Sequence, residues 1–187
     1  MSLVELIAQA DERGLAAGGL ACLDRCLPLL GADDELLRPL WASLADGSDW
    51  APALLKARAA LPAGEQDNEA ALLARRMLDA APAERTADAV RQWADACSVA
   101  SLRIHRLLDP AADGASTDGL DAGRAGDTAD LPPLVAAELR RQTAVLELLA
   151  AHGTHGLRRA LDLSTEGRRV LRAVVSRRER NESGTGS

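Results

Sequence analysis

Apolar residues recur every three or four positions along most of the chain. In the first segment Leu3, Leu6 and Ile7 share one helical face, and later segments repeat this spacing. The segments with this pattern in the N-terminal part are residues 2–14, 19–31, 34–44 and 68–81, with another short one that starts at Ser48 or Asp49. The pattern predicts short helices joined by tight turns.

Glycine and aspartate supply the expected helix boundaries in this part of the chain. Gly14, Gly18 and Gly19 predict a stop and a turn after the first helix. Asp33 or Asp34 is expected to cap the third helix, because a carboxylate there accepts hydrogen bonds from free backbone amides.

The two longest segments of helical spacing lie further along. In residues 83–109 the apolar seam consists of Ala87, Val90, Ala94, Cys97, Ser101, Ile104 and Leu108. After Pro132 and Pro133 a second seam consists of Val135, Leu139, Gln142, Leu146 and Leu149. We expect these two helices to pack antiparallel within the chain, with a homodimer as the other way to cover the first seam.

Residues 109–130 separate these two helices and have a different composition. They contain many Gly, Asp, Ala, Ser and Thr residues and almost no large apolar side chain, so burial cannot offset the entropy lost on ordering. We expect a flexible loop that serves as a linker rather than as a functional lid. Residues 181–187 are expected to form a disordered tail for the same reason.

Composition favours helices throughout. The chain is 47% hydrophobic, yet it has no Phe or Tyr, and Trp41, Trp50 and Trp93 are its only aromatic residues. A core of Leu, Ala and Val predicts an all-α protein, an antiparallel bundle of about seven to eight helices. We expect a single helical domain over residues 1–180, in which residues 131–180 pack back on the helices of residues 1–108.

Charge is unevenly distributed along the chain. Residues 1–131 carry 22 acidic and 12 basic side chains, whereas residues 132–187 carry 6 acidic and 10 basic ones. The last helix is basic and amphipathic, and such a helix can dock an acidic partner. The candidate partner-binding residues are Arg168, Arg169, Arg172, Arg177 and Arg178. The simpler interpretation is that these arginines pair with the acidic body of the fold.

Residues 157–178 also suggest a degenerate helix-turn-helix, with a turn at Leu163 and Ser164. The match fails in detail, because Asp162 stands where the turn usually has glycine and Arg168 stands at an early core position. Lys56 is the only lysine of a net acidic chain, so little surface would neutralise phosphates. A protein partner is therefore favoured over nucleic acid.

Four residues are weak candidates for a metal site. Cys22 and Cys26 lie one helical turn apart, and His152 and His155 lie near a helix end. Packing of the thiols as small apolar side chains is the favoured interpretation, so no metal or cofactor is expected. No P-loop, dinucleotide-binding, zinc-protease or nucleophile-elbow motif is present, and no paired Glu-x-x-His unit suits a di-iron centre.

The motif HGTHG at residues 152–156 is expected to form a corner between two helices. A helix that stops at Gly153 places that glycine in the left-handed region and makes Thr154 the cap of the next helix. The two histidines would then not face a common ion. If the helix instead ran through the glycines, both imidazoles would share a face and could chelate.

Taken together, these patterns predict a non-enzymatic helical protein that acts through protein–protein interaction, as an adaptor, a regulator or a toxin-neutralising protein. The alternatives are a DNA-associated regulator that uses residues 157–178 and, third, an enzyme with an unrecognised site. Three cysteines, an odd number, favour the reducing cytoplasm over a disulfide framework. No secretory signal or membrane-spanning run of apolar residues is expected.

Overall fold

The computed structural model describes residues 1–62, 68–112 and 119–184, which contain nine α-helices, two 3₁₀ turns and no strand. The elements are α1 (Leu3–Gln9), α2 (Glu12–Cys26), η1 (Leu27–Leu29), α3 (Arg38–Asp46), α4 (Trp50–Ala60), α5 (Glu69–Asp79), α6 (Ala87–Leu108), α7 (Leu120–Ala125), α8 (Pro133–His152), η2 (Gly153–Gly156) and α9 (Leu157–Gly184). The predicted all-α helical bundle is confirmed.

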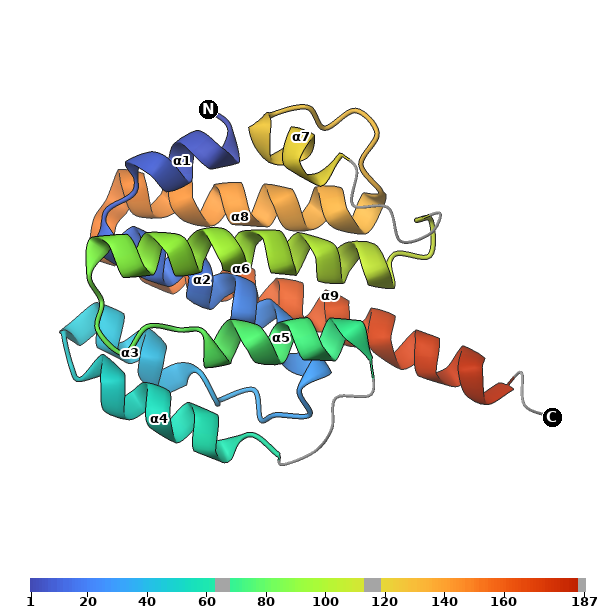
Figure 1. Ribbon diagram of the computed structural model, residues 1–187, viewed down its shortest axis with the longest axis horizontal. Helices are drawn as coiled ribbons and strands as arrows, with labels where there is room; N and C mark the ends of the chain where they lie inside the picture. Colours follow the sequence, from blue (N-terminus) through green and yellow to red (C-terminus); the bar gives the residue numbers. More distant parts are fainter. Residues whose placement is uncertain (63–67, 113–118, 185–187) are drawn as a thin grey trace.

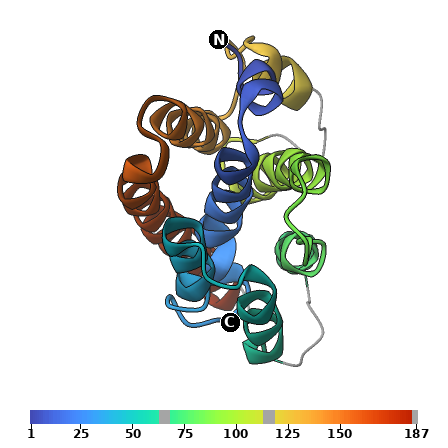
Figure 2. The ribbon, with the colours of Figure 1, turned by 90° about the vertical axis from the view of Figure 1, so that its left-hand side faces the viewer.

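Helix α2 lies at the centre of the bundle, with α6, α8 and α9 around it (Figures 1 and 2). Twelve of its fifteen residues are buried, so it has no polar face turned to solvent. Helices α6 and α8 contact each other and run in opposite directions, as their seams predict (Figure 1). The sequence pattern missed the larger role of α2, because a helix buried all round lacks the amphipathic signal.

The glycines expected to stop the first helix lie inside α2, so that prediction is wrong. Helix α1 ends at Gln9, and Asp11 caps α2 by accepting a hydrogen bond from the Gly14 amide at 2.7 Å. Gly19 serves close packing instead of a turn. A Cβ atom there would lie 2.7 Å from the Trp93 ring, so only glycine lets α6 approach α2 at this point.

Helix α3 begins later than expected and without an aspartate cap. Leu37 is its N-cap residue and makes no side-chain capping bond. Asp33 accepts a hydrogen bond from the Glu35 amide in the preceding turn, and Asp34 forms an ion pair with Arg172 of α9. Both aspartates therefore stabilise the connection before α3 and leave its first turn uncapped.

Part of the expected flexible loop is helical. Helix α7 occupies residues 120–125, and its Leu120 and Arg124 are buried. Arg124 donates a hydrogen bond to Ser98 Oγ at 3.1 Å and forms an ion pair with Asp95, both on α6. Long-range polar contacts thus order a segment that has too little apolar surface to order itself. Residues 113–118 of the expected loop lie outside the described residues.

The expected disordered tail is also helical in part, because α9 continues through Gly184. Residues 185–187 lie outside the described residues. Across the described ranges, no helix combines the length and the apolar character that crossing a membrane requires.

Candidate functional site

A buried carboxylate, Glu138 of α8, is the centre of a polar network inside the bundle. Arg25 of α2 binds it with two hydrogen bonds, Nε to Oε2 and Nη2 to Oε1, each 2.7 Å long. Both side chains are fully buried, with 0% exposure. A bidentate pair of this kind fixes the relative position of the two helices, because both distances and the plane of the guanidinium must be kept.

Helices α6 and α8 supply the other partners of Glu138. Ser101 Oγ donates to Oε1 at 2.8 Å, and Gln142 of α8 donates to the same oxygen at 2.9 Å. Ser98 donates to Gln142 at 2.7 Å and accepts from Arg124 of α7. We call Arg25, Ser98, Ser101, His105, Arg124, Glu138 and Gln142 the Glu138 network.

His105 lies at the edge of this network. Its Nδ1 is 2.7 Å from the Ser101 carbonyl oxygen, which can only accept, so Nδ1 carries a proton. Its Nε2 is 3.5 Å from Glu138 Oε2. Burial lowers the pKa of His105 despite the nearby carboxylate. Burial and the carboxylate therefore act on the pKa of this imidazole in opposite directions.

The two charges of the central pair persist at neutral pH. Burial, the largest single effect, raises the pKa of Glu138, but the charges of Arg25 and His105 together with the hydrogen bonds from Arg25 and Gln142 outweigh it and lower this pKa to about 2. The positive charge of Arg25 is held in turn by Glu138, which raises the pKa of the guanidinium. The network is an internal ion pair in which Glu138 is fully hydrogen-bonded, whereas Nη1 of Arg25 is buried without a hydrogen-bond partner.

Cys22 and Cys26 lie beside this pair and are protonated thiols. Burial raises the pKa of Cys22 to about 12 and raises that of Cys26 as well. Arg25 Nη2 is 3.6 Å from Cys22 Sγ, and Cys26 Sγ is 3.8 Å from Ser101 Oγ. Neither thiol is reactive or accessible, since a nucleophile or a metal ligand must be a thiolate.

The four candidate metal ligands do not form one site. His152 and His155 are exposed at the corner between α8 and α9, whereas Cys22 and Cys26 are buried in α2. Within residues 1–62, 68–112 and 119–184, no group of three or more His, Cys, Asp or Glu side chains is placed to hold a metal ion.

The HGTHG motif forms a corner between two helices, as predicted, but the chain enters the second helix in a different way. Helix α8 ends at His152, and Gly153 has a φ of +53°, a value that favours glycine. A 3₁₀ turn over Gly153–Gly156 then precedes α9, so Thr154 does not cap that helix. Thr154 Oγ1 instead accepts a hydrogen bond from Arg13 of α2 at 3.1 Å.

The helix-turn-helix interpretation is wrong, because α9 runs without a break from Leu157 to Gly184. Arg168, an expected partner-binding residue, is only 7% exposed. It donates hydrogen bonds to Asp24 Oδ1 at 2.7 Å and to the Asp34 carbonyl at 3.0 Å. Arg172 forms an ion pair with the Asp34 carboxylate. These two arginines bind the acidic body of the fold, because the buried carboxylate of Asp24 requires a cation.

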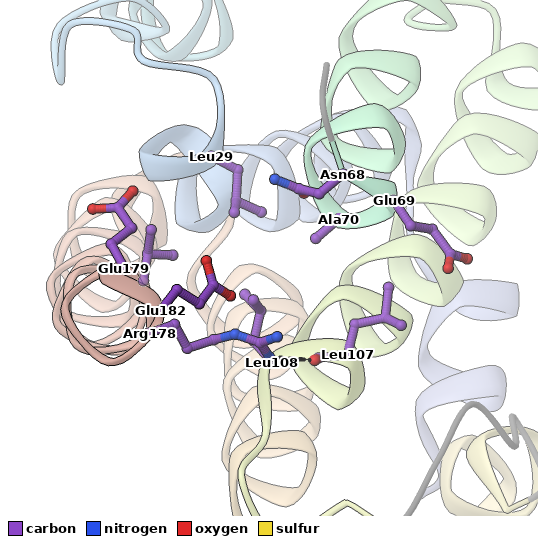
Figure 3. Close-up of a pocket in the computed structure, with 10 residues that line it drawn as sticks. Leu29, Asn68, Glu69, Ala70, Leu107, Leu108, Arg178, Glu179 and Glu182 are labelled. Atoms are coloured by element: carbon purple, nitrogen blue, oxygen red, sulfur yellow. Dashed lines mark hydrogen bonds between the residues drawn. The ribbon is translucent and has the colours of Figure 1, made fainter. Parts of the chain in front are cut away.

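The other three expected partner-binding arginines are exposed. Arg169 and Arg177 face solvent on α9. Arg178 donates a hydrogen bond to the Leu107 carbonyl at the end of α6, with a length of 2.7 Å (Figure 3). That carbonyl belongs to the last turn of α6, where no amide of the helix itself can reach it.

Arg178 also lines an open groove between α9 and the ends of η1, α5 and α6. We call this the α9 groove; its volume is about 400 Å³, and its lining residues are Leu29, Asn68, Glu69, Ala70, Leu107, Leu108, Val175, Arg178, Glu179 and Glu182. Figure 1 shows the distal segment of α9, residues 172–184, extending beyond the ends of α6 and α8. Figure 3 shows Arg178 and Glu182 reaching from α9 towards the other helices.

The α9 groove combines an apolar lining with acidic groups. Leu29, Leu107 and Val175 provide carbon surface from three different elements. Glu69 is already paired with Arg103, whereas Glu179 and Glu182 have no ion-pair partner in the described part of the chain. The groove can therefore accept an apolar group with a cation next to it. Sequence patterns did not predict it, because its residues come from four separate segments.

No model of a known protein family matches the chain. No curated protein and no solved structure shows a significant match either.

Proposed function

We propose that this protein is a non-enzymatic binding protein, and that a segment of a protein partner docks in the α9 groove. The observation that carries the proposal is the open apolar groove bordered by two glutamates without an ion-pair partner among the described residues, Glu179 and Glu182. By contrast, the most chemically rich cluster of the molecule, the Glu138 network, is sealed in the interior.

The lining of the groove indicates the chemistry of the partner. Burial of a leucine-sized side chain against Leu29, Leu107 and Val175 would provide affinity. Glu179 and Glu182 are three residues apart and lie on neighbouring positions of one helix face, so they can share a single Lys or Arg of the partner. The partner segment therefore pairs a large apolar residue with a nearby basic one.

The distal segment of α9 is held in place for this role. Arg178 joins it to the end of α6, and Val174 and Val175 pack against the hydrophobic core. A groove whose walls are already positioned loses less conformational entropy when a partner binds. The internal pairing of Arg168 and Arg172 also leaves less basic surface for nucleic acid than the sequence suggested.

We infer a cytoplasmic location, because three free and buried cysteines suit a reducing compartment.

Selection of a displayed library of random peptides on the full-length protein tests the groove without knowledge of the partner. We expect enriched peptides to combine a large apolar residue with Lys or Arg. The double variant Glu179→Lys, Glu182→Lys should weaken their binding at least about tenfold, because it replaces attraction by repulsion.

The matched control is Glu147→Lys, Glu166→Lys, which makes the same charge change at exposed glutamates outside the groove. This control should keep the affinity within about twofold. Failure of any peptide to enrich would overturn the docking of a foreign protein in the groove. So would peptides that bind the groove variant as well as they bind the wild type.

A further inference from the structure

Helix α4 presents an outer face of unusual composition for this acidic chain. Leu55 is 65% exposed, and Pro52 and Ala59, one turn away on either side, are exposed as well. No acidic residue occurs between Trp50 and Ala60. Single exposed apolar residues are ordinary, but here three of them share a helix face that also lacks negative charge.

Lys56 is the cation that this face offers. The other basic residue of α4, Arg58, points inward and donates hydrogen bonds to the carbonyls of Leu78, Asp79 and Ala81 near the end of α5. Lys56 is exposed and has no ion-pair partner in the described ranges. It is also the only lysine of the chain.

We propose that α4 of a second copy of this chain occupies the α9 groove, with Leu55 on the apolar lining and Lys56 beside Glu179 and Glu182. The argument is charge and apolar complementarity: the groove requires a large apolar side chain next to a cation, and Leu55 and Lys56 are adjacent and exposed. This inference rests on the proposed function, for which it names the partner.

The arrangement of the helices allows two copies of the chain to form a closed dimer. Helix α4 and the distal segment of α9 both lie in the lower half of the two views, with α4 at the left and the distal segment of α9 at the right of Figure 1 (Figures 1 and 2). A two-fold axis between these two ends would bring α4 of each copy to the α9 groove of the other. Such a closed, reciprocal interface avoids the open chains that a one-way contact would generate.

Carbodiimide coupling of the full-length protein tests this contact directly, because the reagent joins an amine to a carboxylate only where the two touch. We expect a covalent dimer whose cross-linked peptides join Lys56 to Glu179 or Glu182. In a mixture of ¹⁴N- and ¹⁵N-labelled protein, these peptides should carry both labels, which identifies the link as one between copies. Cross-links within one chain only, or cross-links that avoid both glutamates, would overturn the inference.

Light scattering after size exclusion measures the non-covalent dimer. Lys56→Arg should keep the dimer while abolishing the cross-link, because the charge remains and the amine is lost. Leu55→Glu and Lys56→Glu should each give a monomer, whereas Val4→Glu, at an apolar residue 44% exposed on α1, should not. Combining Lys56→Glu with Glu179→Lys and Glu182→Lys should restore the dimer.

The peptide selection separates failure of this inference from failure of the proposed function. Peptides that bind the groove of a protein that stays monomeric at high concentration would overturn self-association and leave the groove as a site for another partner. If the selection enriches no peptide but Lys56 cross-links to Glu179 or Glu182, the result would support self-association. It would also exclude a foreign protein as the occupant of the groove.

Discussion

At the scale of single residues, the Arg25–Glu138 pair makes the stability of the bundle sensitive to the loss of either charge alone. Replacing one partner leaves the other as an unpaired charge that is fully buried. We expect Glu138→Gln to lower the free energy of unfolding by about 3–5 kcal/mol, measured by chemical denaturation. Glu35→Gln provides the comparison, since it breaks an ion pair with Arg38 that is mostly exposed, and it should change little.

The double variant Arg25→Leu, Glu138→Leu separates charge burial from packing. Removing both charges eliminates the unpaired group, so this variant should be more stable than Glu138→Gln alone. If the double variant were the less stable one, the pair would be contributing more than the cost of its own burial, and the argument from desolvation would be wrong.

We expect His105 to make the stability of the protein depend on pH. Its pKa in the folded state lies below 6.5, the ordinary value, so the unfolded chain takes up a proton first as the pH falls. The free energy of unfolding should therefore decrease on going from about pH 7 to about pH 5. The charged groups that act on His105 are Glu138, Arg25 and Arg141.

The variant His105→Gln tests this assignment, because glutamine does not titrate and has polar atoms to place near Ser101. We expect the free energy of unfolding of this variant to change less over that pH range. Glu138 affects stability only at lower pH. Its pKa of about 2 in the folded protein lies below the ordinary 4.5, so the stability that its charge contributes is lost only as the pH falls below about 4.5. An unchanged slope in His105→Gln would assign the effect to another group.

At the scale of helices, Gly167 allows α9 to pass over the side chain of Arg25. A Cβ atom at this position would lie 2.4 Å from Arg25 Cδ, and Arg25 cannot move aside without losing its hydrogen bonds to Glu138. We expect Gly167→Ala to cost about 1–3 kcal/mol of unfolding free energy, although alanine favours a helix elsewhere. Gly184→Ala, on the same helix with no atom near, should not destabilise.

The helices also show what a sequence pattern can predict. The seams of α6 and α8 were found because each helix has one apolar and one polar face, and most of those seam residues are buried as expected. The sequence pattern wrongly predicts a break in α2 at its glycines. A helix buried on all sides has no polar face to reveal its extent, and its glycines serve close packing instead of a turn. Helix α7 was missed because Arg124, through contacts with α6, orders it.

The candidate site could not be predicted from those patterns, because it depends on contacts between distant segments of the chain. Cys22 and Cys26 are buried, as expected of thiols that lie between leucines. The α9 groove forms where the ends of four elements meet, and the spacing of residues within one segment cannot predict such a meeting point. The pairing of Arg168 with Asp24 joins residues 144 positions apart. Only the charge asymmetry of the chain indicated that such pairs would form.

At the scale of the whole molecule, ion pairs join the basic C-terminal helix to the acidic N-terminal part, and two of them differ in exposure. The Arg168–Asp24 pair is almost fully buried, and Trp41 donates a further hydrogen bond to Asp24 at 2.9 Å. The Arg172–Asp34 pair is nearly half exposed on both sides. Burial should therefore decide which pair holds α9 against the bundle, since solvent and salt screen the exposed one.

Amide hydrogen exchange of α9 measures that difference. Asp24→Asn leaves the buried guanidinium of Arg168 with only the half-exposed carboxylate of Asp34, 3.7 Å from its Nε, as a counter-charge. We therefore expect loss of about 3 kcal/mol of unfolding free energy and faster exchange around residues 164–175. Asp34→Asn should cost less than about 1 kcal/mol, and added salt should reproduce its effect in the wild type. Equal effects of the two substitutions would show that α9 is held by its apolar face, with Leu171 and Ala160 in the core, and that the buried charge pair only sets its register.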